Sequence, residues 1–127
     1  MKKKILSILS VSVIFTLILA IGACAVTPRW SYLITVVPEI FRSSNEYGVT
    51  VSCDTDVSKI KADVTLYEKG LFGYSEKASY SKTIYNHYGE FTGNYTFSSS
   101  KKYKVEADIT VTTSSGATES TTTELAE

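Results

Sequence analysis

From residue 32 onward the chain alternates apolar and polar residues with a period of two, and no helical periodicity is present after residue 25. In segment 59–68 every second residue is apolar, and segment 102–111 repeats the arrangement. Because successive side chains of a strand point to opposite faces, both segments predict strands with one face in a core and one in water. The predicted core positions are Ile60, Ala62, Val64 and Leu66 in the first segment and Tyr103, Val105, Ala107, Ile109 and Val111 in the second.

Weaker alternation in five further segments brings the expected number of strands to about seven. Pro38 is expected to interrupt the first of these segments, and the last is rich in threonine on both faces, so both are predicted to be edge strands. Short strands at this spacing, separated by polar turns, predict an all-β fold, an antiparallel β-sandwich. The five segments are 32–37, 47–53, 74–85, 91–97 and 117–125.

Residues 1–25 have the pattern of an export signal, predicted to form an N-terminal signal helix. Three lysines follow Met1, an apolar run begins at Ile5, and the small residues Ala23 and Ala25 match a cleavage site. We expect cleavage after Ala25, a secreted or extracellular location, and a single β-sandwich domain over residues 26–127.

Two alternatives to simple secretion stay open. Ile21-Gly22-Ala23-Cys24 resembles a bacterial lipobox, in which an acylated Cys24 would hold the domain at the membrane surface. The apolar run is also about long enough to span a bilayer as an uncleaved anchor. We expect any membrane contact to be made only through this N-terminal segment or a lipid on Cys24.

Loss of the signal turns a neutral chain into an acidic one. The whole chain has 13 basic and 13 acidic residues, and removal of Lys2, Lys3 and Lys4 leaves a net charge of −3. A mildly acidic domain is not expected to bind nucleic acid or anionic lipid. Cys53 is then the sole mature thiol, and its place in an apolar strand predicts a buried side chain rather than a reactive one.

The sequence carries no recognisable catalytic, cofactor-binding or metal-binding constellation, and we predict that the protein is not an enzyme. His87 is the only histidine, in an Asn86-His87-Tyr88-Gly89 segment typical of a solvated loop. Asp54 and Asp56 flank a turn, where an Asx-type turn is a better interpretation than a calcium site.

Tyrosine is unusually abundant, with nine in the chain. Five of them crowd one third of the sequence and form a candidate contact surface, since tyrosine supplies rigid amphipathic contact area. The alternative is that tyrosine simply suits half-buried strand surfaces. The five are Tyr74, Tyr80, Tyr85, Tyr88 and Tyr95.

Two strand motifs resemble those of immunoglobulin and fibronectin-III domains. Val49–Cys53 resembles the second strand of an immunoglobulin domain, and Tyr103–Ala107 resembles the sixth, with a tyrosine two residues before the second cysteine position. Here Val105 stands at that position, so the resemblance implies that Cys53 packs against Val105 without a disulfide. The Tyr-x-Val pattern is closer to fibronectin III.

The chain as a whole resembles small uncharacterised exported proteins of Gram-positive bacteria, which share a Pro-Arg-Trp start after the signal peptide, here Pro28, Arg29 and Trp30. We expect Trp30 to anchor the first strand to the core. This resemblance implies no activity.

The leading hypothesis is a non-enzymatic extracellular or cell-surface interaction module with an unknown protein or glycan partner. One alternative is a small ligand- or carbohydrate-binding domain that uses the tyrosine surface. A weaker alternative is a secreted toxin or bacteriocin-like effector. The oligomeric state is open.

Overall fold

Seven strands in two antiparallel sheets make up the computed structural model, which describes residues 30–127. The predicted all-β sandwich is confirmed, whereas the predicted signal helix, Ala23, Cys24 and Ala25 lie outside the described residues. The elements are β1 (Leu33–Phe41), the 3₁₀ turn η2 (Arg42–Ser44), β2 (Glu46–Cys53), β3 (Val57–Gly70), β4 (Gly73–Ile84), β5 (Tyr88–Asn94), β6 (Tyr103–Thr113) and β7 (Thr118–Ala126).

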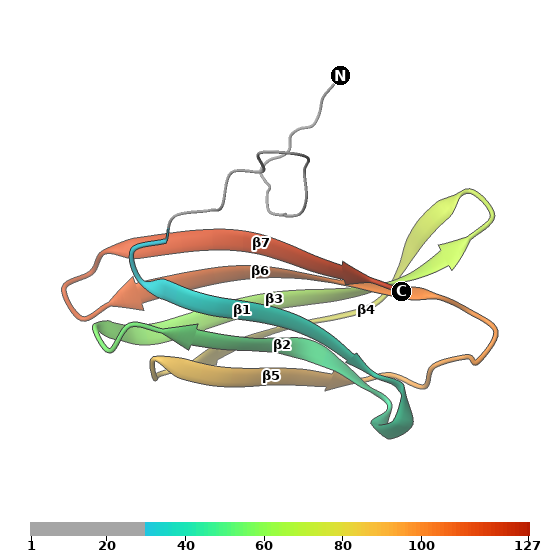
Figure 1. Cartoon of the computed structure of the whole chain (residues 1–127), viewed down its shortest axis with the longest axis horizontal. Coiled ribbons are helices and arrows are strands. Elements are labelled where there is room, and N and C mark those ends of the chain that lie inside the picture. Colours follow the sequence, from blue (N-terminus) through green and yellow to red (C-terminus); the bar gives the residue numbers. More distant parts are fainter. Residues whose placement is uncertain (1–29) are drawn as a thin grey trace, which may run out of the picture.

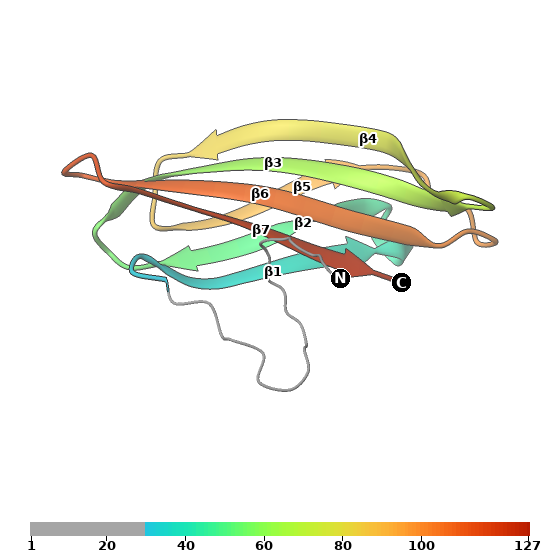
Figure 2. The same cartoon turned by 90° about the horizontal axis from the view of Figure 1, so that it is seen from above.

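The strand orders are β1-β2-β5 in one sheet and β4-β3-β6-β7 in the other, and the two sheets stack face to face (Figures 1 and 2). The first and last strands are both edge strands, as predicted. Pro38 does not interrupt β1, however, and pairs in register with Val49. An edge strand tolerates proline because the missing N–H can fall on the unpaired side.

The core is built from the alternate positions that the sequence predicts. Ile60, Ala62, Val64 and Leu66 of β3 are all fully buried, and so are the five predicted positions of β6. The opposite sheet contributes Tyr47, Val49 and Val51 from β2 and Phe91 from β5. Trp30 packs against this core as expected. Apolar burial at about 25 cal/mol per Å² therefore drives the pairing of the two sheets.

Cys53 is buried and free, as predicted, and burial is the main cause that raises the pKa of its thiol to about 11. The expected packing against Val105 is wrong. Cys53 is followed by a short turn into Val57, which pairs with Thr113, whereas Val105 pairs with Leu66 far along β3. The turn itself is the predicted Asx type, because the Asp56 N–H donates to Asp54 Oδ1 at 3.0 Å.

Glu119 of β7 ties the start of β1 to the other sheet. Its carboxylate accepts three backbone N–H groups, from Ser31 at 2.7 Å and from Tyr32 and Leu33 at 2.9 Å. Hydrogen bonds to a charged acceptor are stronger than neutral ones. This contact closes one end of the open side between the edge strands β1 and β7.

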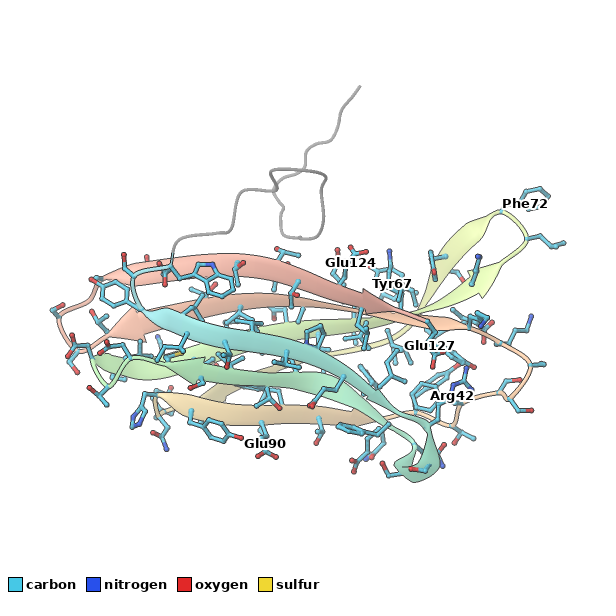
Figure 3. The ribbon with its side chains drawn as sticks, in the orientation of Figure 1. Arg42, Tyr67, Phe72, Glu90, Glu124 and Glu127 are labelled. Carbon is cyan, nitrogen blue, oxygen red and sulfur yellow. The ribbon has the colours of Figure 1, made fainter. Side chains whose placement is uncertain are left out.

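Arg42 closes the other end of that side (Figure 3). Its guanidinium donates two hydrogen bonds of 2.8 Å to the Glu127 carboxylate and also donates to the carbonyl oxygens of Ser98 and Lys101. The same group lies 5.2 Å from the Tyr103 ring centroid. The hydrogen bond from Arg42 lowers the pKa of Glu127. One side chain thus joins the β1–β2 turn, the β5–β6 connection and the chain end.

Two inward-facing tyrosines differ in whether their hydroxyls are satisfied. Tyr103 Oη accepts the Ser98 N–H at 2.8 Å and donates to Glu68 at 3.2 Å. Tyr80 packs against Tyr47 with ring centroids 5.5 Å apart, and its buried hydroxyl has no hydrogen-bond partner among the described residues. A buried polar group without a partner costs roughly 1–3 kcal/mol.

We expect removal of these two hydroxyls to have opposite effects on the free energy of unfolding. Tyr80→Phe should leave stability unchanged or raise it by about 1 kcal/mol, because it removes an unsatisfied group. Tyr103→Phe should lower it by about 1–2 kcal/mol, because two hydrogen bonds are lost and their partners stay in place. Urea denaturation of both variants measures the difference, and an equal loss in the two would contradict this assignment.

The Glu119 contact gives a second prediction. Glu119→Gln should lower the free energy of unfolding by about 1–2 kcal/mol, because the three N–H donors lose a charged acceptor. Glu124→Gln is the matched control on the same strand, exposed and paired opposite Glu106, and should change stability by less than about 0.5 kcal/mol. Thermal unfolding of the two variants side by side provides the measurement.

Candidate functional site

The hairpin of β3 and β4 extends beyond the rest of its sheet (Figure 1). Pairing of β3 with β6 ends at Glu68 opposite Tyr103, but pairing of β3 with β4 continues to Gly70 opposite Gly73. The last backbone link to the sandwich is the bond from the Lys69 N–H to the Lys102 carbonyl, at 2.9 Å. Residues 69–74 therefore form a two-stranded projection, called the hairpin tip below.

Local backbone features set the direction and sharpness of this projection. The β3–β4 register shifts between Leu66 and Tyr67, and such an irregularity bends a strand and increases its twist. The turn consists of Leu71 and Phe72, and Gly73 follows it with a φ of 120°. A side chain is strained at that φ, so glycine at position 73 permits the tight reversal.

Leu71 and Phe72 are the most exposed apolar side chains of the described residues, at 96% and 102% of their reference surface. Figure 3 shows Phe72 at the end of the hairpin, away from both sheets. Folding therefore gains nothing from burying either side chain. Turn positions usually carry glycine, asparagine or aspartate, so an adjacent leucine and phenylalanine are unusual in this place.

The base of the hairpin tip is braced on the outer face of its sheet. The Lys104 ammonium lies 4.6 Å from the ring centroid of Tyr74 and 5.0 Å from that of Tyr67. Tyr67 in turn donates to Glu106 Oε1 at 3.1 Å, and burial, followed by the Glu106 charge, raises the pKa of this tyrosine to about 12. These contacts link β3 and β4 to β6 and hold the base of the hairpin against the sheet.

Charge is polarised along the molecule, with the positive end at the hairpin. The hairpin end is defined as η2 (42–44), the β3–β4 hairpin over 67–77, the β5–β6 connection with the start of β6 (95–104), and residues 126–127. This end carries six basic and three acidic side chains, whereas the remaining described residues carry three basic and ten acidic ones. The basic residues of the hairpin end are Arg42, Lys69, Lys77, Lys101, Lys102 and Lys104.

The five tyrosines of the predicted contact surface do not share one face. Tyr74 lies at the base of the hairpin tip, Tyr80 packs into the core, and Tyr85 is exposed in the β4–β5 connection. Tyr88 faces outward on the other sheet and donates to Glu90, and Tyr95 packs edge-on against Tyr103. Tyr74 and Tyr95 belong to the hairpin end, and of the five only Tyr74 is near the exposed apolar pair.

Tyr80 faces inward because it pairs opposite the buried Val64, and Gly93 leaves room for its ring. A Cβ at this position would lie 2.6 Å from two ring carbons of Tyr80, so the absence of a side chain makes room for the ring between the sheets. The alternation pattern of β4 alone does not show that a glycine on the opposite sheet leaves this room.

Other polar and titratable side chains of residues 30–127 do not come together in a catalytic or metal-binding site. His87 is exposed in the β4–β5 connection, as expected of a loop histidine. The outer face of β1, β2 and β5 is an open hollow whose polar groups satisfy one another, with Thr50 donating to Glu39 and Tyr88 to Glu90. Residues 30–127 contain no group of three or more metal-ligating side chains placed to hold an ion.

Sequence reasoning overlooked Leu71 and Phe72 because they fall between two predicted strands rather than within one. The alternation that predicts strands over 59–68 and 74–85 does not extend into the residues between them. The available signal was the sequence Gly70-Leu71-Phe72-Gly73, two large apolar residues enclosed by glycines.

Over residues 30–127 the structure contains no helix that could cross a membrane. No protein-family model, curated protein or solved structure matches this chain. The hairpin tip and the charge at its base therefore provide the main basis for a functional proposal.

Proposed function

We propose that this protein is an exported, non-enzymatic interaction module that contacts its partner through the β3–β4 hairpin tip. The observation that carries the proposal is the complete exposure of Leu71 and Phe72 at the end of a braced projection. Contiguous exposed apolar surface is disfavoured in a water-soluble domain and commonly marks a contact site. The extracellular location rests on the signal-like residues 1–25.

The proposed fold class is the immunoglobulin/fibronectin-III-like sandwich. In a constant-type immunoglobulin domain the fourth strand joins the sheet of the first two strands. Here β4 instead pairs with β3 in the sheet that contains β6 and β7. This order favours fibronectin III, the closer of the two resemblances in sequence. Domains of this class present their contact residues on strand connections at the ends of the sandwich.

The position at which β1 begins supports a role in which the hairpin tip points outward. β1 begins beside Cys53 and Glu119, at the end of the sandwich where β3 also begins, and β3 then runs 14 residues to the hairpin tip. At about 3.3 Å per residue, the tip lies roughly 45 Å from that end. The tip therefore points away from the end of the sandwich at which β1 begins.

Two features support a non-enzymatic role. No described side chain forms a hydrogen bond with the His87 imidazole, whereas a catalytic base is typically oriented by such a contact. The buried Cys53 thiol, with its pKa of about 11, is a poor nucleophile at neutral pH.

A photocrosslinking residue at the tip tests this function. The full chain with p-benzoylphenylalanine in place of Phe72 should form adducts when it is expressed by an exporting Gram-positive host. We expect these adducts because the tip is the part of the surface that meets the partner. Irradiation of intact cells followed by mass spectrometry of the adducts provides the readout.

The matched control carries the same photocrosslinking residue at position 34. Ile34 is 59% exposed and lies near the opposite end of the sandwich, so few adducts are expected there. Equal adduct formation at positions 34 and 72, or none at position 72, would rule out the hairpin tip as the contact site.

A further inference from the structure

We propose that the partner of the hairpin tip is an anionic phospholipid bilayer, into whose interface Leu71 and Phe72 insert while nearby lysines contact the head groups. This inference rests on the proposed function, because it names the partner class of the same site. It also differs from two expectations based on the sequence: that membrane contact is made only through the N-terminal segment or a lipid on Cys24, and that the acidic domain does not bind anionic lipid.

The shape of the tip suits a lipid interface better than a protein partner. A specific protein interface buries roughly 1,200–2,000 Å² and needs a broad complementary surface. Here the fully exposed apolar surface is confined to two adjacent side chains at the end of a narrow projection. A bilayer accepts such a wedge at a depth of about 5–10 Å without any preformed pocket.

Tyr74 lies where an interfacial side chain is expected. It stands two residues behind Phe72, is 37% exposed, and has its ring beneath the Lys104 ammonium. Tyrosine and lysine both favour the head-group region, because each has an apolar body and a polar end. The sequence of side chains from tip to base is thus apolar, then amphipathic, then cationic.

Three lysines near the base of the hairpin are available for head-group contact. Lys69 and Lys102 are joined through the backbone at 2.9 Å, and Lys101 precedes Lys102 in the β5–β6 connection. Among the described residues none of the three forms a salt bridge, and all three are exposed. Each lysine close to an anionic surface strengthens binding by about fivefold.

Charge polarity favours one orientation on the bilayer. The hairpin end has three more basic than acidic side chains, whereas the rest of the described residues have seven more acidic than basic ones. An anionic surface therefore attracts the tip and repels the body, which directs the long axis of the sandwich toward the membrane normal. Because β1 begins near the end of the sandwich opposite the hairpin tip, this bilayer need not be the one that holds residues 1–25.

Vesicle co-sedimentation tests the lipid assignment. The protein is prepared as the full chain with Cys24→Ser, processed and released by an exporting host, so that no acyl group contributes to binding. We expect it to bind vesicles of equimolar phosphatidylglycerol and phosphatidylcholine and to bind pure phosphatidylcholine much more weakly, because zwitterionic vesicles offer the lysines no net charge.

Two pairs of variants separate the apolar and ionic contributions. Leu71→Ser with Phe72→Ser should weaken binding by roughly 100-fold, and Lys101→Gln with Lys102→Gln by about 30-fold. The matched controls are Ile34→Ser with Val37→Ser, both exposed on β1, and Lys61→Gln with Lys82→Gln outside the hairpin end. Neither control pair should change binding more than about twofold.

Failure of the lipid assignment is distinguishable from failure of the proposed function. Absence of vesicle binding, or equal binding to both lipid mixtures, overturns the lipid assignment. If position 72 still forms protein adducts on cells under those conditions, the contact site stands and its partner is a protein. If tip variants and controls bind vesicles equally, the tip is not the membrane contact.

Discussion

The packing of alternate side chains of β3 and β6 against β2 and β5 is the constraint on which the rest of the molecule depends. The lone described cysteine is free and buried, so no disulfide within residues 30–127 reinforces this core. Burial of β-branched, leucine and aromatic side chains holds the sheets together. Two ionic contacts, from Glu119 and between Arg42 and Glu127, then close the side where β1 and β7 leave both sheets open. The hairpin tip projects from the sandwich that these contacts hold together.

Rigidity matters for the proposed function, because a projecting two-stranded hairpin has little stability of its own. On the outer face of the sheet, Tyr67 and Tyr74 contact Lys104 and Glu106 of β6. These contacts anchor the base of the hairpin to the buried pair β3–β6. The exposed pair Leu71 and Phe72 thus stands on a hairpin whose base contacts the sheet. The same arrangement places the cationic side chains just behind the apolar tip.

Sequence reasoning predicted the strands and core because both follow from local alternation, as the burial of Ile60, Val64 and Ile109 illustrates. It mispredicted the partner of Cys53, since the packing of two sheets depends on register between strands distant in the chain. It grouped five tyrosines because they lie close together in the sequence, although Tyr80 pairs opposite the buried Val64 and therefore faces the core. It missed the hairpin tip, because that projection arises where the pairing of β3 with β4 continues to Gly70 after its pairing with β6 has ended at Glu68.

The central claim, that the hairpin tip enters an anionic membrane, is tested most directly by an environment-sensitive fluorophore on Leu71→Cys in the Cys24→Ser chain. The Cys53 thiol is buried with a pKa of about 11, so labelling is selective for the tip. Phosphatidylglycerol-containing vesicles should shift the emission of this label to shorter wavelength and leave a label on Ile34→Cys unchanged. An unchanged emission at position 71 while the protein is bound to vesicles would contradict the claim.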